Sequence, residues 1–146
     1  MGILSVLPRI SATPASTLDT TQPISSTPFT ISNDGLLDIH NVQISCIYAH
    51  VDSKYAQIDT PGPYKEGKLG GFLVPDVSPV LESSRKRTFD CFFPFIMQTP
   101  ILHADIILVI NFRQSFLPFR SQRTIRFVTA GGPDGTLHWF EEPVPK

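Results

Sequence analysis

Cys46 and Cys91 are the only cysteines of the 146-residue chain, and their thiols are the groups best suited to covalent chemistry. Each falls at an inward-facing position of a predicted strand. Two cysteines without a CxxC spacing do not make a zinc site on their own. The two thiols therefore either form a disulfide between strands, as exported sandwich domains often do, or remain free as small core side chains.

The histidines and carboxylates show no spacing typical of a catalytic or metal site. Asp34 and Asp134 lie in Asn-Asp-Gly and Pro-Asp-Gly sequences, where an aspartate side chain usually bonds the turn backbone. No phosphate-binding loop, EF-hand, zinc-protease or serine-hydrolase motif occurs. We therefore expect no catalytic, cofactor-binding or metal-binding residue, and a protein that is not an enzyme. The histidines are His40, His50, His103 and His138.

Residues 113–123 place three large apolar side chains among arginines, in the connection between two predicted antiparallel strands. Such a combination is typical of contact with a protein partner or with an anionic membrane surface. The alternative is that the tip folds back and its phenylalanines cover one end of the core. The candidate interface residues are Arg113, Phe116, Leu117, Phe119, Arg120 and Arg123.

Composition narrows the class of protein. Twelve Lys and Arg against 13 Asp and Glu give a net charge of -1, which removes a general attraction to nucleic acid. With 41% hydrophobic and 17% charged residues the chain is expected to fold, and 14 prolines disfavour a helical bundle. The longest purely apolar run, residues 106–110, is far shorter than the roughly 20 residues of a membrane helix.

Alternation of apolar and polar residues predicts strands throughout the chain. A phase change near His40 and Asn41 indicates a bulge or a break. In residues 104–112 both faces are apolar, which is typical of a central strand covered on both sides. The predicted strands are residues 28–32, 37–48, 72–74, 87–93, 104–112, 124–129 and 137–139, with residues 7–11 as a candidate edge strand.

About seven short strands, separated by turn residues and without helical periodicity, predict an immunoglobulin-like antiparallel β-sandwich. A chain of this length is expected to form one core. Residues 1–27, rich in Ser, Thr and Pro, are expected to be an extended lead-in, and residues 28–146 the sandwich domain.

Four segments resemble an uncharacterised group of bacterial β-sandwich domains. They are PFTISNDGLLDIHNVQISC (28–46), RTFDCFFPF (87–95), ADIILVINFRQSFLPFRSQRTIRFVT (104–129) and DGTLHWFEEPVP (134–145). In that group the domain follows one or two membrane helices, which implies a periplasmic or cell-surface location and a membrane-anchored longer form. Similar sequences carry cysteines at both positions, which favours the disulfide. This chain shows no such helices, so a cytoplasmic location stays open.

These observations lead to two functional hypotheses. The first is a non-catalytic extracytoplasmic interaction or structural domain that binds a protein partner or self-associates. The second is a peripheral module that binds anionic lipid or another anion through residues 113–123. Neither requires a cofactor or nucleic acid.

Overall fold

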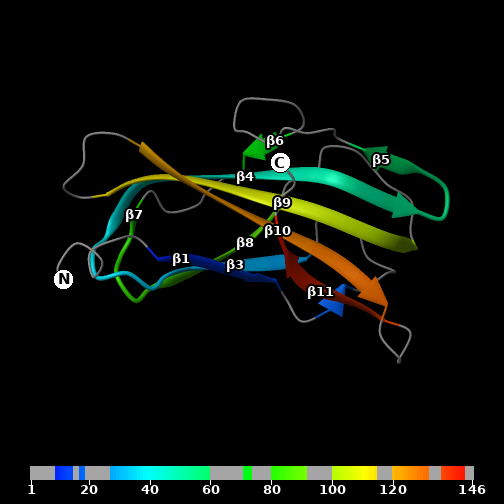
Figure 1. Cartoon of the computed structure of the whole chain (residues 1–146), viewed down its shortest axis with the longest axis horizontal. Helices are drawn as coiled ribbons and strands as arrows, with labels where there is room; N and C mark the ends of the chain where they lie inside the picture. The colour runs from blue at the N-terminus through cyan, green and yellow to red at the C-terminus, as the bar shows by residue number, and fades with distance from the viewer. Residues whose placement is uncertain are drawn as a thin grey trace.

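In the computed structural model the described residues form two antiparallel sheets that pack against each other (Figure 1). They include eleven strands and no helix, so no described segment is a candidate membrane-spanning helix. The predicted β-sandwich is confirmed, while its immunoglobulin-like character stays a prediction. The described residues are 9–14, 17–18, 27–59, 71–73, 80–91, 100–114, 120–131 and 136–143.

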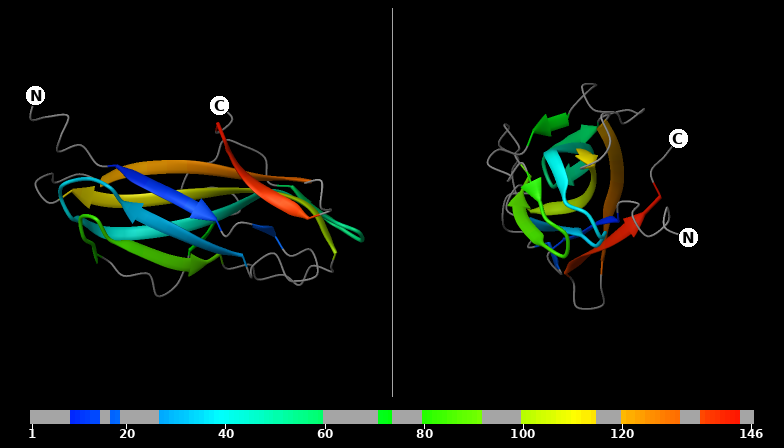
Figure 2. Two further views of the ribbon diagram at one scale, coloured as in Figure 1. Left: turned by 90° about the horizontal axis from the view of Figure 1, so that it is seen from below. Right: turned by 90° about the vertical axis from the view of Figure 1, so that its left-hand side faces the viewer.

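The smaller sheet, sheet A, has the strand order β1 (Ile10–Pro14), β3 (Pro28–Asn33) and β8 (Lys86–Asp90). It crosses the long strands of the second sheet, as the left view of Figure 2 shows. β1 forms one edge of the sheet, and its Ile10 and Ala12 side chains are buried in the core. The edge strand expected at residues 7–11 therefore lies slightly later in the chain.

The larger sheet, sheet B, is built around two long central strands, of 15 and 14 residues, which pair along most of their length. Two further short strands pair with the same edge of β4 as β5 does. Its order is β2 (Thr17–Leu18), β11 (Leu137–Glu142), β10 (Arg120–Gly131), β9 (Ile101–Gln114), β4 (Ile39–Ser53) and β5 (Gln57–Asp59), with β6 (Gly71–Leu73) and β7 (Val80–Leu81) on β4.

Each of the seven predicted strands overlaps a strand of the structure, and these are β3, β4, β6, β8, β9, β10 and β11. The bulge expected near His40 is also present, because the register of β4 with β9 shifts between His40 and Gln43. Asn41 at this point has a φ of 52°, a left-handed conformation that asparagine tolerates better than most residues. A second register shift follows between Tyr48 and His50.

The core between the sheets contains an aromatic group centred on Phe29 of β3. Its ring lies 5.6 Å from Phe127 and 5.7 Å from Trp139, both on sheet B, and 6.1 Å from Phe89 on β8. Packing of this kind contributes about 0.5–1.5 kcal/mol per pair beyond the burial of area. Phe29 therefore packs the middle strand of sheet A against sheet B.

The outer face of sheet B also buries apolar side chains. Ile107 and Val109 of β9 are fully buried and form a second cluster with Ile47 and Ala49 of β4, separate from the core between the sheets. This confirms that β9 is a central strand covered on both faces.

Candidate functional site

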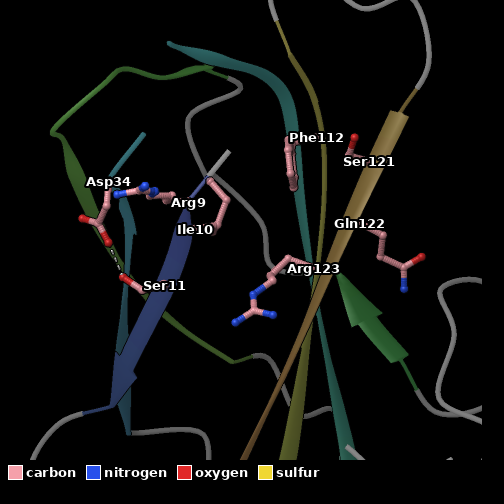
Figure 3. Close-up of a pocket in the computed structure, with 8 residues that line it drawn as sticks. All are labelled: Arg9, Ile10, Ser11, Asp34, Phe112, Ser121, Gln122 and Arg123. Atoms are coloured by element: carbon pink, nitrogen blue, oxygen red, sulfur yellow. Dashed lines mark hydrogen bonds between the residues drawn. The ribbon is translucent and has the colours of Figure 1, made fainter. Parts of the chain in front are cut away.

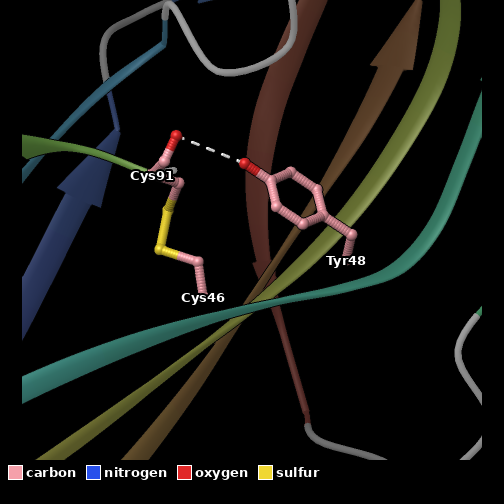
Figure 4. Close-up of a disulfide and its surroundings, with 3 residues drawn as sticks. All are labelled: Cys46, Tyr48 and Cys91. Atoms are coloured by element: carbon pink, nitrogen blue, oxygen red, sulfur yellow. Dashed lines mark hydrogen bonds between the residues drawn. A yellow bond between two sulfur atoms is a disulfide. The ribbon is translucent and has the colours of Figure 1, made fainter. Parts of the chain in front are cut away.

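A disulfide links the two sheets near the middle of the molecule. Cys46 lies on β4 and Cys91 directly follows β8, with their Cα atoms 5.8 Å apart (Figure 4). Both residues are buried, so the bond joins the β8 edge of sheet A to the interior of sheet B. Of the two alternatives left open by the sequence, the disulfide is confirmed.

Tyr48 supports this junction from β4. Its hydroxyl donates a hydrogen bond to the Cys91 carbonyl oxygen, with 3.3 Å between the oxygens (Figure 4). Burial raises the pKa of the Tyr48 phenol above its usual value, because the phenolate would lose its hydration. The phenol therefore remains a hydrogen-bond donor throughout the neutral range.

On the opposite side of sheet A an open groove of about 420 Å³ lies between β1 and β10. This volume falls within the usual range of ligand sites. Figure 3 shows the two strands facing each other across it. The lining residues are Arg9, Ile10, Ser11, Asp34, Phe112, Ser121, Gln122 and Arg123.

The β10 side of the groove is a strand edge without a described partner. β9 pairs with Arg120 to Val128 on one side of β10, whereas β11 on the other side pairs only from Arg126 onwards. The first half of β10, residues 120–125, therefore has β9 on one side and the groove on the other. Alternate residues there direct backbone polar groups away from β9.

The β1 side is a second strand edge of this kind. The Asp34 amide donates to the Arg9 carbonyl oxygen at 2.8 Å, so these directly opposed residues are a hydrogen-bonded pair of the β1–β3 ladder. Because such pairs alternate along an antiparallel ladder, Ser11 and Thr13 also bond to β3. The amides and carbonyls of Ile10 and Ala12 then point away from β3, and both residues are buried.

Arg123 supplies positive charge inside the groove. It lies on the same inward-facing side of β10 as Ile125 and Phe127, yet its side chain is exposed. Figure 3 shows its guanidinium directed into the space between the strands, whereas Gln122 points away. Among the described residues Arg123 makes no ion pair, which leaves its guanidinium available to an anionic group.

Arg9 and Asp34 lie on the opposite wall. Arg9 immediately precedes β1 and is exposed. Asp34 accepts a hydrogen bond of 2.8 Å from the Ser11 hydroxyl, which fixes the carboxylate against β1. Among the described lining residues the charged side chains are Arg9, Asp34 and Arg123, and their charges sum to +1.

The prediction that the Asp34 side chain bonds the turn backbone is wrong. Asn33, at the end of β3, performs it instead: its Oδ1 accepts the Gly35 amide at 3.1 Å. The side-chain nitrogen Nδ2 of Asn33 also donates hydrogen bonds to the backbone carbonyls of Leu37 and Leu81. Because Asn33 is fully buried, its side chain takes these partners and the Asp34 carboxylate is free to contact Ser11. Asp134 lies outside the described residues.

The structure describes only part of the interface predicted at residues 113–123. Arg113 at the end of β9 and Arg123 on β10 are exposed, and of these two Arg123 lines the groove. The backbone of Arg120 begins β10 and pairs with Arg113. Phe116, Leu117 and Phe119 lie outside the described residues.

A separate polar cluster lies near the other end of β9, on β4 and β5. His50 contacts Asp52 at 2.9 Å and Asp59 at 3.3 Å, and its ring lies 6.0 Å from that of His103. The hydrogen bond to Asp52 is the largest cause of a raised His50 pKa, and Asp59 adds to it. No group of three potential metal ligands was found within the described part of the chain.

Sequence reasoning identified Arg123 but missed the other groove residues. A usable signal was present, because Arg123 has the same phase as Ile125 and Phe127 and so places a charge at a core-facing position. The neighbours on β1 could not be found this way, since their placement depends on how the two sheets stack. The His50 cluster was missed because it depends on the second register shift of β4.

Comparison with known protein families, with curated proteins and with solved structures finds no match to this chain.

Proposed function

We propose that this chain is a non-catalytic interaction domain that works outside the cytoplasm and binds an anionic group of a partner in the groove between β1 and β10. The observation that carries the proposal is Arg123, whose exposed guanidinium stands at a core-facing position of β10 and points into the groove. A guanidinium stays protonated at any physiological pH. It is therefore suited to holding an anion rather than to transferring protons.

The proposed location rests on the disulfide. The Cys46–Cys91 bond joins the sheets, and such bonds form and persist mainly in oxidising compartments such as the periplasm or the cell surface. A structural bond of this kind suits a rigid domain whose groove is preformed for its partner.

The test is a nuclear magnetic resonance titration with N-acetylglutamate, a small carboxylate. We expect the amide signals of Ser11, Gln122 and Arg123 to shift, and Arg123→Gln to weaken the response about tenfold, because a charge-assisted hydrogen bond is lost. Arg113→Gln is the matched control, since Arg113 is exposed on β9 but does not line the groove. An unchanged response in Arg123→Gln would exclude the groove as the site.

A second candidate function is a peripheral module for anionic lipid. It is favoured by the exposure of both Arg113 and Arg123 at the end of the sheet where β9 leads into β10. Basic residues near an anionic membrane contribute about 1 kcal/mol each, and salt screens the attraction. Sedimentation with phosphatidylserine vesicles tests it: adsorption that salt reverses and that either arginine variant weakens would favour this function over the first.

A further inference from the structure

We infer that His50 is the centre of a proton-dependent latch, which holds the short strand β5 against β4 when the ring is protonated and loosens β5 when the ring is neutral. The latch consists of His50, Asp52 and Asp59, at the end of the molecule where β4 turns into β5 (Figure 1). The inference goes beyond the proposed function, because it concerns a part of the molecule away from the groove and does not depend on what the groove binds.

A carboxylate faces each ring nitrogen of His50. Nε2 lies 2.9 Å from Oδ2 of Asp52 on the same strand, and Nδ1 lies 3.3 Å from Oδ1 of Asp59 on β5. Because an ionised carboxylate only accepts hydrogen bonds, both contacts are favourable only when both ring nitrogens carry a proton. A neutral imidazole carries one proton and directs a lone pair at the other carboxylate. The bridge between the two strands therefore requires the imidazolium.

The two carboxylates differ in their access to water. The Asp52 side chain is 23% exposed and its Oδ1 is buried without a hydrogen-bond partner, whereas the Asp59 side chain is 79% exposed. Asp59 can exchange its bond to the ring for bonds to water, and Asp52 can do so far less readily. We therefore expect the neutral ring to keep its proton on Nε2, facing Asp52. The lone pair of Nδ1 then repels Asp59, so loss of the proton breaks the link to β5.

Few other contacts hold β5 within the described part of the chain. The strand is three residues long and pairs with β4. Gln57 and Asp59 are exposed, and Ile58 between them is partly buried against the core. Short edge segments of this kind open locally at low free energy. A single ion pair is therefore enough to change how often β5 opens.

Other charged groups near the latch lie on β9, on β10 and in the turn. Asp105 lies opposite His50 on β9, and the Arg126 guanidinium of β10 binds its carboxylate at 2.7 and 2.9 Å, which balances its charge. Lys54 in the turn lies over the ring of Tyr55. The ring of His103 on β9 lies 6.0 Å from that of His50. Since His103 is a second histidine at this place, its variant is the matched control.

Amide hydrogen exchange at Ile58, followed by nuclear magnetic resonance across the titration of His50, tests the latch. The Ser53 amide bonds the Ala56 carbonyl across the turn, so by alternation Val51 and Ile58 form the next hydrogen-bonded pair. The protection factor corrects for the intrinsic pH dependence of exchange. We expect it to fall about threefold as the pH rises through the His50 pKa, which lies above 6.5.

Three variants separate the latch from a general effect of pH. His50→Gln removes the titrating ring, and Asp59→Asn removes the link to β5 but leaves His50 to titrate against Asp52. Both should abolish the fall in protection at Ile58, whereas His103→Gln should keep it. Constant protection in the wild-type protein, or an equal fall in Asp59→Asn, would overturn the inference.

Nitrogen-15 resonances of the His50 ring test the order in which the contacts break. Below the transition both ring nitrogens should be protonated, and above it the proton should remain on Nε2. A neutral ring with its proton on Nδ1 would preserve the contact with Asp59 and so contradict the latch. None of these measurements involves the groove, so their failure would leave the proposed function standing.

Discussion

The two edges of sheet A differ in how they meet sheet B. At the β8 edge a disulfide and the Tyr48 hydrogen bond connect the sheets, and Cys91 and Phe89 are buried. At the β1 edge no covalent bond joins the described strands, and the space towards β10 is an open groove with charged walls.

This difference separates the residues that hold the fold from those available for binding. At the β8 edge, which is the closed edge, the inward-facing positions hold sulfur and aromatic side chains. On β10 the inward-facing positions hold the buried Phe127 and Ile125, followed by the exposed Arg123. A charge at such a position is compatible with folding only where the opposing sheet does not cover it. We therefore expect stability to depend on the closed edge and ligand binding on the open one.

Removing the disulfide should give the largest effect. For Cys46→Ala with Cys91→Ala we expect a loss of about 4 kcal/mol, the chain-entropy value for releasing a loop closed over 45 residues. Urea denaturation of the variant, beside the reduced wild-type protein as a control with the same loss, measures this. A loss below about 1 kcal/mol would show that packing alone holds the closed edge.

Asn33, at the end of the middle strand of sheet A, should give the next largest effect. Its side chain makes three hydrogen bonds, to Leu37, Leu81 and Gly35, while fully buried. Asn33→Ala leaves these backbone groups without partners and should cost about 2–3 kcal/mol. Ser32→Ala, the neighbouring residue on the same strand, is the control and should change stability by less than about 0.5 kcal/mol. Similar losses in both variants would contradict this account.

These two effects also show what the sequence could predict. The alternation of β3 and β10 was readable because burial on one face dictates period two, and the inward-facing positions placed both cysteines in the core. The roles of Asn33 and Asp34 were not readable, because either side chain can bond a turn and the choice depends on Leu81, 48 residues later. The groove depends on the β1 edge lying opposite β10, a contact between sheets that local pattern does not encode.

The pH dependence of the free energy of unfolding reports on the His50 cluster, which lies apart from both edges of sheet A. The carboxylates of Asp52 and Asp59 raise the folded-state pKa of His50 above its usual 6.5. The stabilisation from protonated His50 is therefore full below pH 6.5 and is lost as the pH rises through the folded-state pKa. We expect the wild-type protein to lose a small part of its stability over this window, and His50→Gln to remove that slope. A slope that persists in His50→Gln would assign it to another group. The disulfide variant should keep the slope, since its cysteines lie away from this cluster.

Arg123→Ala should have the smallest effect on folding, and it is the most direct test of the comparison between the edges. The guanidinium is exposed and makes no ion pair with a described residue, so the free energy of unfolding should change by no more than about 0.5 kcal/mol. Ile125→Ala, two residues along the same face of β10, removes a buried side chain and should cost about 2–5 kcal/mol. Urea denaturation of both variants measures the contrast.

If Arg123→Ala instead destabilises the protein by more than about 1 kcal/mol, the arginine is part of the packed interior and the β1 edge is closed like the β8 edge. A near-neutral change, with binding of N-acetylglutamate lost, would place Arg123 among the residues kept for the ligand.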